Sequence, residues 1–491
     1  MNIENAVAWL LGVVWSPVLV GLCLLAGLYF SIRTRFIQLR ALPDMVRLLF
    51  NSSSSAAGVS SFQALSLSLS SRVGVGNIAG VALAIGYGGP GAVFWMWCVA
   101  FLGAASAFME STLAQIYKER DANGQYRGGP AYYIEKALGQ RWYAVLFAWS
   151  AVIGCGLLLP GTQSNAIASA LDGAWGVPAV YSALGMVTAT GLVIFGGVRR
   201  IARVTQVVVP FMAVGYLLVA AVVMGVHYET LPGMFRLIVD SAFGTDAAFG
   251  AMLGTAIQWG VRRGVMSNEA GMGTGAHPAA AAEVSHPVKQ GLVQAFSVYI
   301  DTMVVCSATA FLILAAGAYN VYEPGAGGAL LVAHVPGLEA GPHYVQRAVE
   351  STLPGFGAGF IALAILPFAF STILALYYNA ETNVVFLRHN RACPWTIRLF
   401  RLAFLGVASW SAINSATVAW SLGDIGVGLM SWFNIIALLL LQKPALAALR
   451  DYEKSRRAGL DPVFDPCAAG VVRAELWDDI AATHRSERKD G

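Results

Sequence analysis

The residues with the clearest chemical meaning lie in one interrupted hydrophobic segment, residues 62–87. Gly74 and Gly76 flank Val75 and are followed by Asn77, a pattern that predicts backbone unwinding inside a bilayer. Each unpaired backbone group costs several kcal/mol in hydrocarbon, so such a break persists only where it lines a cavity or binds a solute. The freed amides of Val75, Gly76 and Asn77 could bind a carboxylate, and the freed carbonyls a cation. For an isolated glycine such as Gly80, close helix packing is the simpler interpretation.

A second interruption is predicted in the hydrophobic segment 247–275, around Gly260 and Gly264. The two interrupted segments are expected to cross the membrane in opposite directions. Two antiparallel broken helices facing one another are typical of secondary transporters, with the substrate held between them. We therefore count Gly260 and Gly264 among the candidate substrate-binding residues.

Charged and aromatic residues accompany this second segment. Arg262 and Arg263 lie between the two glycines, and an arginine near the middle of a bilayer costs at least ~2.5 kcal/mol unless it faces water, a carboxylate or carbonyls. Trp259 could form a wall that limits substrate size. Asn268 and Glu269 are expected near the cytoplasmic exit, in gating or capping, although Glu269 could equally have a structural role.

Two further polar positions lie within apolar spans. Ser371 and Thr372 place adjacent hydroxyls in span 357–387, and hydroxyl and carbonyl oxygens are ligands that Na⁺ accepts. Such hydroxyls also commonly bond back to a carbonyl one turn earlier. Gln163, in the fourth span, could contact a substrate amino group.

Three carboxylates and one more arginine lie within or near spans: Glu110, Asp301, Glu381 and Arg72. Intramembrane carboxylates are functional by default, but pairing with Arg72, Arg262 or Arg263 is an equally good interpretation. Glu110 and Asp301 would be the proton sites of a proton-coupled carrier.

Composition excludes a soluble protein. Of 491 residues, 57% are hydrophobic and only 12% are charged, against roughly 25% charged in soluble domains. The basic residues are spread over loops, which does not indicate nucleic-acid binding. We find no HExxH or CxxC spacing and no nucleophile–base pattern, so we expect neither an enzyme nor a metal cofactor.

The fold class predicted is an all-α polytopic membrane protein with eleven transmembrane helices. The expected spans are 7–32, 62–87, 92–117, 142–171, 177–195, 204–226, 247–275, 291–319, 357–387, 395–422 and 425–441. Loops rich in Arg and Lys alternate with loops nearly free of them, such as 423–424. Because basic loops lie on the cytoplasmic side, the N-terminus is expected outside and the C-terminus in the cytoplasm.

Setting the first span aside leaves two sets of five, each begun by an interrupted helix, which predicts a 5+5 inverted repeat. The expected organisation is an N-terminal helix and linker (1–61), a first repeat (62–226), an external linker (227–246), a second repeat (247–442) and a soluble cytoplasmic tail (443–491).

Four stretches resemble one family. GVGNIAGVALA at 74–84, GGPGAVFWMW at 88–97, GGPAYY at 128–133 and SNEAGMG at 267–273 are similar to the alanine or glycine:cation symporters, also called sodium:alanine symporters. The resemblance covers about residues 60–442.

This resemblance implies the amino-acid transporter fold (LeuT-like), in the plasma (inner) membrane, and Na⁺-driven uptake of small neutral amino acids. The carbonyls of Ser70 and Val73, with the Ser371 and Thr372 hydroxyls, would hold Na⁺, and the amides of Val75 and Gly76 the substrate carboxylate. A proton-coupled carrier of the same fold and, from another class, an ion channel remain as alternatives.

Overall fold

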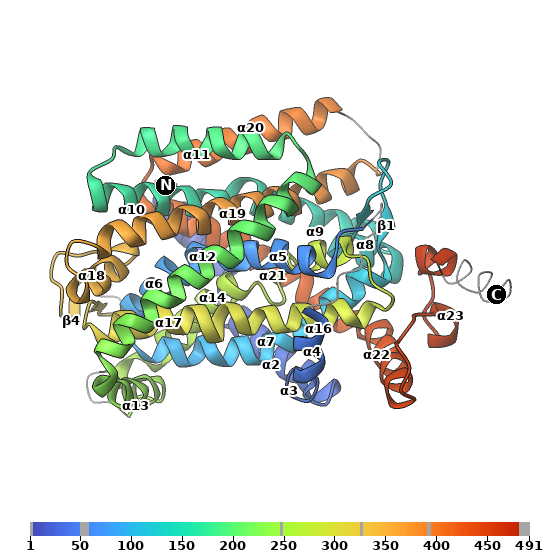
Figure 1. Cartoon of the computed structure of the whole chain (residues 1–491), viewed down its shortest axis with the longest axis horizontal. Helices are drawn as coiled ribbons and strands as arrows, with labels where there is room; N and C mark the ends of the chain where they lie inside the picture. Colours follow the sequence, from blue (N-terminus) through green and yellow to red (C-terminus); the bar gives the residue numbers. More distant parts are fainter. Residues whose placement is uncertain (1–2, 50–57, 246–248, 325–327, 390–393, 481–491) are drawn as a thin grey trace.

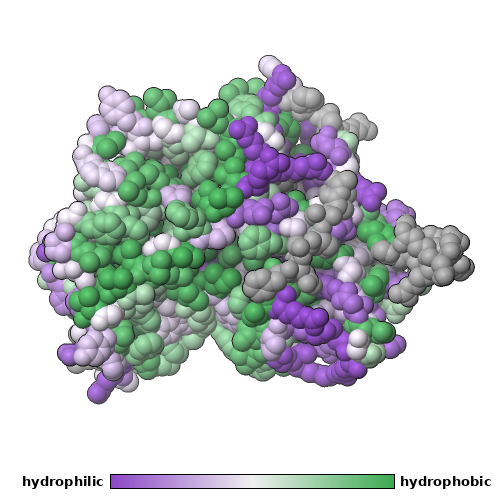
Figure 2. Space-filling model, in the orientation of Figure 1, coloured by the Kyte–Doolittle hydropathy of each residue, from purple (hydrophilic) through white to green (hydrophobic). Residues whose placement is uncertain are grey.

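The computed structural model describes residues 3–49, 58–245, 249–324, 328–389 and 394–480. Most of this chain is helical, and the long helices run along the horizontal axis of Figure 1, with the N- and C-termini toward opposite ends. Hydrophobic side chains cover much of the middle of one face, and hydrophilic ones gather toward the end where the C-terminal tail lies (Figure 2). This distribution is that of a bundle whose middle contacts lipid.

The first part of the chain contains α1 (Ile3–Val14), α2 (Pro17–Arg33), α3 (Ile37–Arg40), α4 (Leu42–Leu49), α5 (Ser61–Arg72), η1 (Val75–Asn77), α6 (Ala79–Gly88), α7 (Gly91–Ile116), β1 (Glu119–Arg120), β2 (Tyr126–Arg127), α8 (Pro130–Tyr133), η2 (Ile134–Leu138), α9 (Arg141–Ile153), η3 (Gly154–Leu158), α10 (Leu159–Trp175), α11 (Ala179–Ile194) and α12 (Val198–Val226). Strands β1 and β2 form an antiparallel hairpin.

The second part contains η4 (Tyr228–Thr230), α13 (Leu231–Ala242), η5 (Gly250–Met252), α14 (Leu253–Asn268), α15 (Ala276–Ala281), α16 (Pro287–Val298), η6 (Tyr299–Cys306), α17 (Ser307–Ala315), β3 (Asn320–Tyr322), β4 (Leu330–Ala333), α18 (Pro342–Thr352), α19 (Gly357–Leu387), α20 (Pro394–Ala412), α21 (Ala416–Leu440), α22 (Gln442–Arg457) and α23 (Pro466–Ala469). Strands β3 and β4 pair antiparallel.

Seven helices among the described residues are long and apolar enough to cross a membrane: 5–33, 91–116, 141–175, 199–226, 287–315, 357–387 and 416–440. The spans 141–175 and 287–315 are each continuous helices that pass through a π-helical segment, η3 and η6 respectively. The chain is therefore a multi-pass membrane protein.

The boundary between the last two predicted spans is wrong. The predicted loop 423–424 lies inside α21, and the real turn lies at 413–415. A carboxylate such as that of Asp424 is rarely found inside an apolar span. Asp424 is 1% exposed and paired with arginines, so the helix can continue through it.

The tail after residue 442, which was predicted to be a soluble segment, packs against the helix bundle. The amide of Phe464 donates to the Ser285 carbonyl over 2.9 Å, and the Trp477 indole donates to the Gln115 carbonyl over 2.7 Å. Both aromatic side chains are buried. The tail thus covers the ends of α7 and α16. The predicted boundaries between repeats stay predictions, and residue 246 and the linker part 51–57 lie outside the described residues.

Candidate functional site

The first predicted break is confirmed. Helix α5 ends at Arg72, the 3₁₀ turn η1 follows, and α6 starts at Ala79. The Asn77 side chain holds this turn open, because its Oδ1 accepts from the Gly74 amide at 2.8 Å while its Nδ2 donates to the Asp301 carboxylate at 2.6 Å. An amide side chain therefore replaces the helical partners that the break removes.

The second break exists but was placed wrongly. Helix α14 is continuous through Gly260 and Gly264 and ends at Asn268. The unwound stretch runs from Glu269 to Gly275, where Gly271 and Gly273 have φ of 84° and 90°. These left-handed conformations favour glycine, so the break belongs there.

Gly260 and Gly264 serve close packing against α7. A methyl group at Gly260 would lie 2.5 Å from the Ala92 carbonyl oxygen, and one at Gly264 would overlap Val99. Small residues allow such close approach of membrane helices. The structure does not bring these two glycines to the space between the breaks.

One small cavity, of about 10 Å³, lies where the two breaks meet α10 and α19. Its lining includes, from the predicted site, Arg72, Gly76, Gln163, Glu269 and Thr372, together with Ser71, Gly74, Leu159, Met266, Met272 and Leu376. The cavity has room for about one water molecule, so the protein is closed around this site in this conformation.

Gln163 of α10 reaches the first break directly. Its Oε1 accepts from the Val75 amide at 3.2 Å. One of the two amides proposed for a substrate carboxylate is therefore occupied by a side chain in this closed state. Substrate would have to displace Gln163, or use its other polar atom.

Of the two adjacent hydroxyls in α19, Thr372 contacts the break. Its Oγ1 lies 2.8 Å from the Ser70 carbonyl and 2.9 Å from the Phe368 carbonyl one turn earlier, and it is close to Gly74. The Ser371 hydroxyl donates to the Phe368 carbonyl at 3.1 Å and faces Met212 of α12. Val73, the remaining predicted Na⁺ ligand, is buried and caps α5 through its amide.

A layer of charges and rings closes the side of the cavity toward α6 and α14. Arg262 and Arg263 both bond Asp424 of α21. Trp259 lies under the Arg262 guanidinium, 4.8 Å from carbon to ring centre, and stacks on Tyr87 at 4.9 Å. Trp259 therefore belongs to this layer and not to the cavity wall. Asp424 was not identified from the sequence as the partner of these arginines. The sign of it in the sequence is a single aspartate within an apolar run.

The predicted carboxylates take separate roles. Glu110 accepts from the Asn434 amide at 3.0 Å, and Glu381 pairs with Arg401 at 3.6 Å. Arg72 bonds the Gln294 carbonyl at 2.9 Å and the Ser297 hydroxyl, which fastens α5 to α16.

Asn268 stabilises the turn after α14, since its Oδ1 accepts from the Ala270 amide at 3.0 Å. Glu269, expected near the cytoplasmic exit, instead lies at the cavity, where it accepts from the Ser71 hydroxyl at 2.6 Å.

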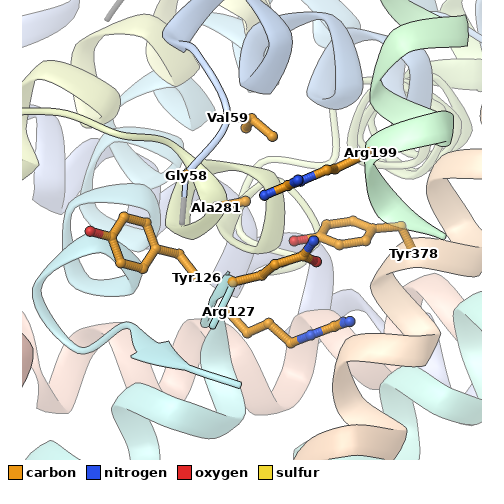
Figure 3. A pocket seen from close by; sticks show the side chains of 8 residues that line it. Gly58, Val59, Tyr126, Arg127, Arg199, Ala281 and Tyr378 are labelled. Carbon is orange, nitrogen blue, oxygen red and sulfur yellow. The ribbon is translucent and has the colours of Figure 1, made fainter. Parts of the chain in front are cut away.

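On the other side of the cavity, the segment that leads into α5 meets the segment that follows α15. Val59, before α5, forms a bridge with Ala282, after α15. Beside this bridge is a pocket of about 20 Å³ lined by Arg127, Arg199 and Tyr378, and the side-chain ends of Arg199 and Tyr378 point the same way into it (Figure 3). Arg127 is held by Asp121 at 2.7 Å. The central cavity is thus covered on both sides.

Comparison with known proteins assigns the chain to a family. Residues 1–466 match the sodium:alanine symporter family. YrbD of Bacillus subtilis (strain 168) is 56% identical over 98% of this chain and 99% of its own. The sodium/proton-dependent alanine carrier protein of Bacillus sp. (strain PS3) is 47% identical over 91% of this chain and 99% of its own.

A more distant relative is the sodium/alanine symporter AgcS of Methanococcus maripaludis, which is 36% identical over 90% of this chain and 96% of its own. Among solved structures, a Na⁺-coupled sialic acid symporter in a substrate-bound, outward-open state aligns over 98% of both chains, with 14% identity and a TM-score of 0.49. Those last two values are too low to assign a shared fold. By full-length sequence similarity, however, the chain belongs to the sodium:alanine symporter family.

Proposed function

We propose that this protein is a secondary active symporter that couples Na⁺ entry to uptake of a small neutral amino acid, such as alanine or glycine, across the plasma membrane. The observation that carries the proposal is the meeting of two broken helices at one cavity lined by Gln163 and Thr372. Membership of the sodium:alanine symporter family supports it, as does similarity to the alanine carrier of strain PS3 and the alanine symporter of Methanococcus maripaludis.

The architecture that fits this function has eleven crossings. To the seven long helices we add the interrupted pairs α5–α6 and α14–α15, the 16-residue α11 and the 19-residue α20. Helices α5–α6 and α14–α15 would begin the two five-helix repeats. The N-terminus would lie outside and the tail in the cytoplasm, in line with the positive-inside rule.

Transport would proceed by alternating opening of the two closed layers. In the closed state the cavity holds about 10 Å³, too little for an amino acid, so substrate entry requires separation of α14 from α21 at the Arg262–Asp424 contact. Na⁺ at the Ser70 carbonyl and Thr372 hydroxyl would hold α5 against α19. The small side chain of the substrate would face the α14 side.

The driving force is sufficient with one ion. Each Na⁺ that moves down ~100 mV releases about 2.3 kcal/mol, and about 1.4 kcal/mol corresponds to a tenfold concentration ratio. One ion therefore supports accumulation of several tens of fold.

Uptake of radiolabelled alanine into proteoliposomes tests the proposal. With a Na⁺ gradient, the purified protein should accumulate alanine, and replacement of Na⁺ by choline should remove the accumulation. Equal uptake in choline that responds to a pH gradient would replace it with the proton-coupled carrier. Current without substrate would favour a channel.

The two hydroxyls of α19 should differ in importance. Because Thr372 contacts the Ser70 carbonyl and Ser371 faces Met212, we expect Thr372→Ala to raise the Na⁺ concentration for half-maximal uptake about tenfold, the loss of one charge-assisted oxygen contact of about 1.4 kcal/mol. Ser371→Ala should change it by less than about twofold. Na⁺ titration of uptake measures both, and a larger effect at Ser371 would place the ion on the other side of α19.

A further inference from the structure

The cavity contains a carboxylate that the neutral Na⁺ site above does not use. Glu269 is 3% exposed, and its backbone has φ of 56°, a left-handed conformation that a residue with a side chain rarely adopts. Such strain persists where the surrounding structure requires the side chain to point in a particular direction. Here that direction is the cavity between the two breaks.

The carboxylate joins the two broken helices through oxygen atoms. Its Oε1 accepts from the Ser71 hydroxyl, in the last turn of α5, at 2.6 Å. Its Oε2 accepts from the Thr274 hydroxyl, in the second unwound stretch, at 2.6 Å. Ser71, Glu269, Gln163 and Thr372, each of which carries a side-chain oxygen, line this small cavity together with Arg72.

Charge balance at this position calls for a cation. Within the part of the chain that the structure describes, Glu269 makes no ion pair, and its hydrogen-bond donors are neutral hydroxyls. The Arg72 guanidinium lines the same cavity and attracts Glu269, but it is shared with two further buried carboxylates, those of Glu110 and Asp301, and it is bonded to Gln294 and Ser297 of α16. Three buried carboxylates beside one guanidinium leave an excess of negative charge, which is unfavourable, and hard monovalent or divalent cations prefer ligands of this oxygen type.

We propose that Glu269 is a direct ligand of the coupling cation, together with the Ser71 and Thr372 hydroxyls. This inference rests on the proposed function and changes the site from a neutral one into one with a fixed negative charge. The cation would then bind three elements at once: α5, the second break and α19. Its binding would draw both broken helices together, which is the motion that coupling requires.

The test is binding of radioactive ²²Na⁺ to the purified full chain in detergent, without amino acid. We expect Glu269→Gln to raise the half-saturating Na⁺ concentration at least tenfold and Ser71→Ala to raise it in the same direction by a smaller factor. Glu269→Asp, which keeps the charge, should bind Na⁺ more tightly than Glu269→Gln. The matched control is Glu381→Gln, another buried glutamate, which pairs with Arg401 outside the cavity and should leave the midpoint unchanged.

Wild-type affinity in Glu269→Gln would overturn this inference, as would an equal shift in the control. If Glu269→Gln does not fold, by gel filtration and thermal melting, an unchanged midpoint in Ser71→Ala overturns it instead. Absence of Na⁺ binding in the wild type would contradict the proposed function as well, so the two failures are distinguishable.

Discussion

Replacement of Gly74 by alanine is expected to reduce Na⁺-driven alanine uptake about 100-fold, the scale on which ~1 Å displacements act at a site. A methyl group on Gly74 would overlap the Thr372 hydroxyl and lie 3.2 Å from Gln163 Oε1. It would therefore push apart α5, α10 and α19 at the point where they share the cavity. Initial rates of uptake in proteoliposomes, normalised to inserted protein, measure the effect.

Gly80 provides the matched control. It lies four residues after Gly76, in α6, and a methyl group there would have its nearest neighbour, Arg263 Cδ, at 3.9 Å, an ordinary contact. Gly80→Ala should keep near wild-type uptake. If both variants lose activity equally, the loss reflects general damage to the helix, and the Gly74–Thr372 approach has no special role.

Loss of Asp424 should destabilise the protein by about 3 to 5 kcal/mol, the range measured when one partner of a buried ion pair is removed. In Asp424→Asn, Arg262 and Arg263 would remain buried beside each other without their counter-charge. Arg263→Gln should cost less, because Arg262 and Asp424 then remain as a balanced pair. Thermal unfolding in detergent measures the loss of stability in each variant, and the melting temperature of Asp424→Asn should be the lower of the two.

Asp172→Asn, at an exposed aspartate near the end of α10, is the control and should melt with the wild type. A melting temperature of Asp424→Asn equal to that of Arg263→Gln would mean that the layer is not held by charge balance. In proteoliposomes, Asp424→Asn should also lower uptake, since the layer it closes could no longer seal.

The sequence predicts the first break because its signal is local. Two glycines and an asparagine in an apolar run leave few other structures for Gly74–Asn77. The second break was misplaced because Gly260 and Gly264 also interrupt an apolar run, yet they contact α7. In the second segment, the glycines that unwind the chain, Gly271 and Gly273, have positive φ, which cannot be read from composition.

The remaining differences come from contacts between distant segments. Asp424 and Arg262 are 162 residues apart, and nothing local indicates that α21 brings the carboxylate to the arginines. Similarly, Glu269 was predicted to lie near the cytoplasmic exit, but its left-handed backbone conformation directs the side chain into the cavity. Ser371 and Thr372 are adjacent in sequence, and only the rotation of α19 decides which of them reaches Ser70.

The central claim is that cation and amino acid share one cavity between the two breaks, and thermodynamic linkage tests it most directly. Isothermal titration of the purified protein with alanine at several Na⁺ concentrations, and with Na⁺ at several alanine concentrations, gives both affinities. We predict that Na⁺ tightens alanine binding by the same factor, at least tenfold, by which alanine tightens Na⁺ binding. Alanine affinity that is identical in Na⁺ and in choline would contradict the account.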